Sequence, residues 1–156
     1  MGRVLIACIG NSLLGDDKVG ELIAREIVKL GVPDGVDVRF YGSSLFDLIH
    51  DVVEYNGLVI VDAVVSNGRT GEVIVERVNW NDVDRIDNLK LNLHTLSVNE
   101  VLGLIKELNY KVKAAVVGVE ASSFKLGGRV SEIVEKRVVE AAIEALKVAM
   151  EMLGGG

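Results

Sequence analysis

The sequence predicts an α/β protein in which helices cover both faces of a mixed β-sheet. Two observations support this: strand and helix patterns alternate along the chain, and one connection between strands is too short to contain a crossover helix. The length of 156 residues and the 49% share of hydrophobic residues are enough for the core of one domain, expected to span residues 1–156.

Two strand–helix pairs come first. The apolar runs Val4–Ile9 and Val36–Tyr41 are typical of strands, and the first is continuous enough to be buried on both faces. We expect the first helix to begin at Asp16 or Asp17, either of which could cap it, and the second to begin at Ser44. Their predicted buried faces are Val19, Leu22, Ile23, Ile27 and Leu30, then Leu45, Leu48, Ile49, Val52 and Val53.

Three strands and two helices follow. Leu58–Val65 is almost wholly apolar and predicts the third strand. A short connection containing Gly68 leads to the fourth, Val73–Val78, which should therefore run antiparallel to the third. Val112–Val117 predicts the fifth strand. Two more helices are predicted by their N-terminal signals, from a capping box at Ser97 to about Leu108 and from Ser131 to about Leu153.

Composition excludes several classes of protein. The net charge of −6, with no run of basic residues, makes nucleic acid an unfavourable partner. The single cysteine, Cys8, excludes an intramolecular disulfide and fits a reducing compartment. No uncharged stretch approaches the roughly 20 residues of a membrane span, and the N-terminal apolar run is too short for a signal peptide. We therefore expect a cytoplasmic protein.

The turn after the first strand carries two adjacent carboxylates. Gly10 and Gly15 have the spacing of a phosphate-binding loop, but Asp16 and Asp17 stand where its Lys and Ser/Thr should follow. Two carboxylates disfavour an anion and suit a cation. The alternative is that both aspartates only cap the helix.

Two further residues could complete a cation site. Asp62 lies within an apolar strand, where a carboxylate is costly unless a cation or several donors meet it; the alternative is a structural partner such as Arg69, a lysine or a helix N-terminus. His94 precedes a predicted helix and could reach across a cleft, or have no special role. His50 shares its helix face with acids and is expected to be solvated, and Cys8 to pack in the core.

Two carboxylates and an imidazole form a ligand set for a borderline divalent metal, with positions left open for substrate or water. The sequence contains neither an H-E-x-x-H zinc motif nor a G-x-S-x-G nucleophile elbow.

Four segments resemble the [NiFe]-hydrogenase maturation endopeptidases. The stretch from Gly10 to Gly20 is similar to their G-N-x-L-x-x-D-[DE]-x-x-G opening, and Leu58–Ala63 to their strand ending in Asp-Ala. Leu93–Leu96 is similar to their histidine segment, and Val117–Glu120 to their closing pattern. This chain departs from the pattern at Phe40, Ala121 and Glu132, where the family often has an acid and two prolines.

The resemblance implies a three-layer α/β/α sandwich of the phosphorylase/hydrolase-like type, with a five-stranded mixed sheet and one antiparallel strand. It implies that Asp17, Asp62 and His94 are the metal ligands and act in catalysis through substrate nickel, while Asp16 is the acid beside the first ligand. The implied activity is removal of the C-terminal extension of a hydrogenase large-subunit precursor after nickel insertion. Nickel would arrive with the substrate, with no permanently bound cofactor, and the protein would be a monomer.

Two other functions stay open at this point: a nickel-sensing chaperone that cuts nothing, and a metal-dependent hydrolase of small amides that holds its metal permanently. Whether a carboxylate also acts as general base is undecided by the sequence.

Overall fold

The computed structural model describes residues 2–66, 68–83 and 98–154. Five strands form one sheet in the order β2-β1-β3-β5-β4. All neighbours are parallel except β4, which runs antiparallel to β5. The prediction of a mixed sheet with one antiparallel strand is confirmed. The strands are β1 (Val4–Ile9), β2 (Val36–Gly42), β3 (Gly57–Val64), β4 (Val73–Arg77) and β5 (Lys113–Glu120).

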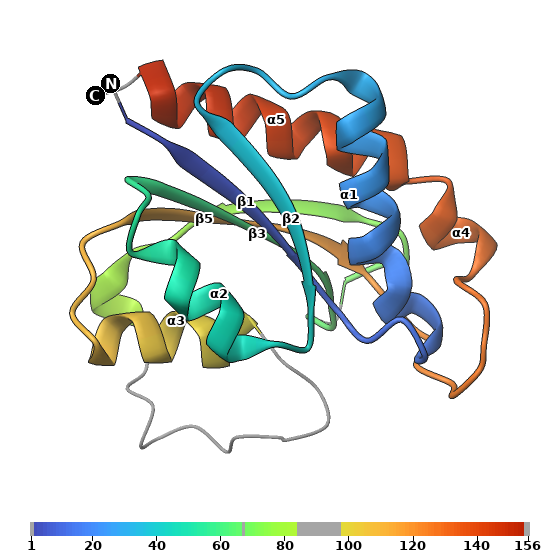
Figure 1. Ribbon diagram of the computed structural model, residues 1–156. Helices are drawn as coiled ribbons and strands as arrows, with labels where there is room; N and C mark the ends of the chain where they lie inside the picture. Colours follow the sequence, from blue (N-terminus) through green and yellow to red (C-terminus); the bar gives the residue numbers. More distant parts are fainter. Residues whose placement is uncertain (1, 67, 84–97, 155–156) are drawn as a thin grey trace.

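Helices cover both faces of the sheet (Figure 1). The long helices α1 (Val19–Leu30) and α5 (Val138–Gly154) pack on one face, and α2 (Leu45–Val52) and α3 (Val98–Glu107) on the other. The predicted three-layer sandwich is therefore confirmed. Three short pieces complete the described elements: the 3₁₀ turns η1 (Gly15–Lys18) and η2 (Trp80–Asp82), and the helix α4 (Glu132–Glu135). None of the described helices is long and apolar enough to cross a membrane.

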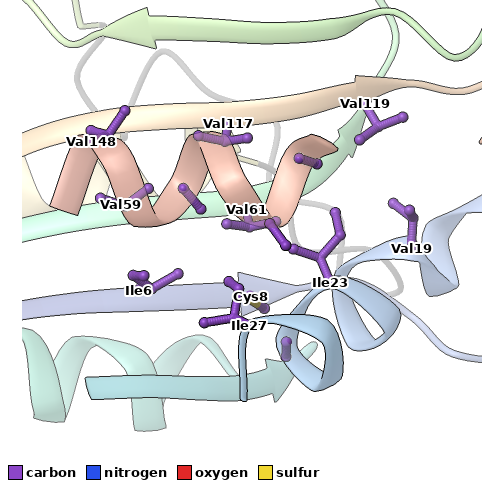
Figure 2. Close-up of a cluster of buried hydrophobic side chains, with 14 of the residues drawn as sticks. Ile6, Cys8, Val19, Ile23, Ile27, Val59, Val61, Val117, Val119 and Val148 are labelled. Carbon is purple, nitrogen blue, oxygen red and sulfur yellow. The ribbon is translucent and has the colours of Figure 1, made fainter. Parts of the chain in front are cut away.

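The side chains of β1 and β3 alternate between two cores. Ile6 and Cys8 of β1 and Val61 of β3 point toward α1 and α5, where they meet Ile23 and other buried aliphatic side chains (Figure 2). Leu5, Ala7 and Ile9 lie in the opposite core, beneath α2 and α3. The expectation that Cys8 packs in the core is confirmed, because its side chain is fully buried. Burial in this apolar layer raises the pKa of its thiol far above the usual range.

The start of α1 differs from the prediction. Asp16 and Asp17 lie in η1, and neither caps the α-helix, which begins at Val19 with no side-chain cap. Both carboxylates are buried and used elsewhere. The predicted burial of Leu30 and Val53 is also wrong: these side chains are 47% and 54% exposed, at the last turn of α1 and just beyond α2, where each helix has passed the edge of its core.

The C-terminal half also differs from the prediction. β5 runs to Glu120, three residues beyond the predicted end, because it pairs with β3 along its whole length. The single helix predicted from Ser131 is divided into α4 and α5, with Lys136 and Arg137 between them. Ser97, the predicted cap of α3, lies outside the described residues.

The fold should be most sensitive to shortening a side chain of the central strand, β3. Ile60 is fully buried between β1 and β5, so Ile60→Ala should lower the free energy of unfolding by about 2–5 kcal/mol through lost burial and a residual cavity. Ile143→Ala, at a side chain 41% exposed on α5, should change it by less than about 1 kcal/mol. Urea denaturation followed by circular dichroism measures both, and equal losses would contradict the assignment of Ile60 to the core.

Candidate functional site

The predicted aspartates meet at the carboxyl end of the sheet. β1 and β3 are neighbouring parallel strands, with Cys8 opposite Val61 at the end of their register. Asp62 is the next residue of β3, and the turn η1 that follows β1 carries Asp17. Ligands of open α/β sheets bind at this edge. Both side chains are buried, Asp17 at 7% and Asp62 at 4% exposure.

Among the residues that the structure describes, each of these two carboxyl groups receives one backbone hydrogen bond. The Asn11 N–H donates to Asp17 Oδ2 over 2.7 Å, and the Ala63 N–H donates to Asp62 Oδ1 over 2.8 Å. The two carboxyl groups also lie close to each other. A carboxylate has about four acceptor positions, so both groups keep free capacity for a ligand.

The two carboxyl groups also shift each other's pKa. Burial, and then the charge of Asp17, raises the pKa of Asp62 well above its usual range. Burial also raises the pKa of Asp17, although the interactions with Asn11 and Asp62 act in the opposite direction. Asp62 is therefore the less acidic of the two groups. No cation contacts either carboxyl among the described residues, so the alternative that Arg69 or a lysine pairs with Asp62 is not supported there.

Two glycines let the backbone close around this pair. At Gly10, which has φ 142°, a Cβ atom would lie 2.1 Å from the Asp17 carbonyl oxygen. At Gly20, a Cβ atom would lie 2.1 Å from the carbonyl oxygen of Ile9. No side chain fits at either distance. These contacts press η1 and the first turn of α1 against the end of β1, which holds Asp17 beside β3.

Asp16 has the opposite environment from its neighbour. Its side chain is fully buried and accepts three backbone hydrogen bonds, from Ser122 and Ser123 at 3.1 Å each and from Ser131 at 2.6 Å. Burial alone would raise the pKa of this carboxyl, but the three donors lower it below the usual value. With three of about four acceptor positions filled, Asp16 is nearly saturated, and it ties η1 to the loop between β5 and α4.

Glu120 is a second carboxylate with most of its acceptor positions filled. It borders the site, which the sequence did not predict. It ends β5, is 2% exposed, and accepts bonds from the Ser66 N–H, the Ser66 hydroxyl and the Gly68 N–H at 2.8, 2.8 and 3.0 Å. Against the effect of burial, these donors lower its pKa. The signal was the one that marked Asp62: an acid at the end of an apolar strand.

A groove of about 640 Å³ opens beside Asp62. It is lined by residues from the carboxyl end of β3, from β5 and β4, from η2 and from the start of α3, and Asp62 is one of them. A ligand in the groove would therefore meet a carboxyl group with unused acceptor positions.

His94, the third predicted ligand, lies outside the described residues, so its position relative to Asp17 and Asp62 stays a prediction. Within residues 2–66, 68–83 and 98–154, no three His, Cys, Asp or Glu side chains are placed together to hold a metal ion. His50 is exposed on α2, as expected.

The three hydrogen bonds to Asp16 indicate that this carboxylate stabilises the folded state in a pH-dependent way. Asp16→Asn removes the charge and puts an amide donor against backbone N–H groups, so it should lower the free energy of unfolding by about 1–3 kcal/mol at pH 7. Because the folded pKa is lowered, this loss should be full above about pH 5 and shrink as the pH falls toward 3. Asp34→Asn, at an exposed side chain, is the control for urea denaturation across this range.

For Asp62 we expect the reverse pH dependence of stability from that of Asp16. Its raised folded pKa means that the native state is penalised at neutral pH and relieved on acidification. Asp62→Asn should therefore raise the free energy of unfolding at pH 7 by about 1 kcal/mol, with the gain vanishing as the pH falls toward 4. Thermal and urea unfolding of the variant and the wild type measure this difference. A less stable variant at pH 7 would show that the carboxyl is structural.

Comparison with known proteins gives a consistent result. Over 155 residues the chain is 26% identical to the hydrogenase 2 maturation protease of Escherichia coli, covering 97% of this chain and 93% of the relative. It is 27% identical over 128 residues to a putative hydrogenase maturation protease of Methanocaldococcus jannaschii, covering 79% of each.

Solved structures share the fold. The hydrogenase maturating endopeptidase HybD of E. coli matches with a TM-score of 0.78 at 25% identity, covering 96% of this chain and 93% of that one. The [NiFe] hydrogenase maturation protease HycI of Thermococcus kodakarensis matches with a TM-score of 0.73 at 23% identity and the same coverage. The family model described as hydrogenase maturation protease matches residues 22–148, and this chain belongs to that family.

Proposed function

We propose that the chain is an endopeptidase that removes the C-terminal extension of a [NiFe]-hydrogenase large-subunit precursor and recognises nickel already bound to it. Membership of the maturation protease family supports peptidase activity on a hydrogenase precursor. One observation supports the nickel part: among the described residues, the two buried carboxyl groups of Asp17 and Asp62 keep free acceptor positions, and Asp62 lines a groove. A cytoplasmic location and a monomeric state belong to the same proposal.

In this proposal Asp17, Asp62 and His94 bind the nickel that the precursor carries. Oxygen and imidazole ligands without a thiolate suit a metal that is shared with the substrate and released with it. The bound metal would polarise the scissile carbonyl or lower the pKa of a bound water. The protease residues position the metal, and cleavage then depends on correct loading of the precursor.

The closeness of the Asp17 and Asp62 carboxyl groups favours a second mechanism, in which the pair activates water directly. Two carboxyl groups that share a proton can act as general acid and general base without a metal. This mechanism predicts cleavage of precursor that contains no nickel, whereas the first requires nickel.

The test is to incubate the purified chain with nickel-loaded and nickel-free precursor and to measure C-terminal truncation by mass spectrometry. We expect truncation of the loaded precursor only. Asp17→Asn, Asp62→Asn and His94→Ala should each slow it by about 100-fold or more, because each removes a ligand of the metal. His50→Ala, which changes an exposed histidine on α2, should leave the rate unchanged.

Other outcomes identify the rival functions. A precursor that binds without any change in mass would indicate a nickel-sensing chaperone. Purified protein that carries stoichiometric metal and hydrolyses small amides would indicate a general metal-dependent hydrolase. Equal truncation of both precursors would favour the carboxyl-pair mechanism.

A further inference from the structure

We propose that the groove beside Asp62 binds the precursor segment adjoining the scissile bond in an extended conformation, and that Glu76 and Asp82 select a lysine or arginine in that segment. This inference rests on the proposed protease function and names the part of the precursor that the groove reads. Three features of the described residues support it: the floor of the groove, its unpaired acids and its length.

The floor is apolar and lies on the sheet face that carries α2 and α3. Val64, Val116 and Ile74 line it, and each side chain is partly exposed. Gly118 adds no side chain, and a Cβ atom there would lie 2.8 Å from the two Cγ atoms of Val64. The glycine therefore lets Val64 fold over β5 and keeps the floor low. A shallow aliphatic floor along strand ends suits the side chains of an extended peptide.

The part of the groove formed by β4 and η2 is acidic. Glu76 and Asp82 line it and are exposed, and neither side chain makes an ion pair or hydrogen bond among the described residues. The cation lining the groove, Arg77, belongs to an ion pair with Glu151 of α5, on the opposite face of the sheet. Two unpaired carboxylates thus face a ligand in the groove, and a cationic side chain complements them.

Strand register sets the distance between Glu76 and Asp62. Asp62 lies opposite Gly118, which lies opposite Ile74, and Glu76 follows two residues later on β4. Two strand spacings of about 4.8 Å and two residue rises of about 3.4 Å separate Asp62 from Glu76 by roughly 12 Å. An extended chain covers that distance in about three or four residues. The selected cation should therefore lie about three or four residues from the scissile bond.

The test compares cleavage kinetics of nickel-loaded precursor by the wild type, Glu76→Gln, Asp82→Asn and the double variant. We expect the double variant to raise KM about tenfold at low salt with kcat within about twofold, because the acids contact a part of the substrate that does not react. The increase should shrink at high salt. Glu54→Gln, at an exposed acid beyond α2 that does not line the groove, controls for the general loss of negative charge.

A charge exchange tests the contact directly. Replacing the precursor's lysine or arginine at that distance by glutamate should raise KM with the wild type, and Glu76→Lys should restore cleavage of that altered precursor. A double variant with the same KM as Glu54→Gln, or a charge exchange without rescue, overturns the groove assignment alone. A wild type that cleaves no precursor overturns the protease function and this inference together.

Discussion

Two carboxyl groups lie side by side in the interior of this protein with one backbone donor each, and the surrounding structure holds them there. Burying an incompletely bonded carboxyl group is costly, and the cost rises when a second carboxyl group lies beside it; both effects raise the pKa of Asp62. The pair persists because its backbone is fixed by contacts that no side chain could share, at Gly10 and Gly20. The energy of the sheet and its two cores thus offsets a local penalty at the carboxyl ends of β1 and β3.

The division among the buried acids near the site explains how that arrangement is held. Asp16 and Glu120 are nearly saturated with donors and have lowered pKa values, which is the environment of structural carboxylates. Their hydrogen bonds fix η1, which contains Asp17, and the turn after β3, the strand that contains Asp62. The unsaturated pair has raised pKa values and unused acceptor positions. Hydrogen-bond saturation, rather than burial, therefore separates anchors from candidate ligands, because all four groups are buried.

The antiparallel strand β4 enlarges the surface beside Asp62. β4 extends the sheet beyond β5, and at its far end the sheet face that carries α3 remains open as a groove. A sheet that stopped at β5 would lack the side chains of Ile74 and Glu76 and hence much of the groove floor. The short connection between β3 and β4 therefore gives Asp62 a neighbouring surface long enough to bind several residues of a polypeptide.

Local signals in the sequence were enough to predict the strands and the antiparallel step, and a lone acid in an apolar run was enough to make Asp62 a candidate ligand. The two acids of the first turn were candidates as well. The different environments of these adjacent aspartates depend on the tertiary structure, since the donors that bind Asp16 come from residues 122–131, more than 100 positions away. The same holds for Glu120, whose partners lie in another loop, and for Leu30 and Val53, whose helices extend past their cores. Periodicity tells which face of a helix is apolar, but not where the neighbouring layer ends.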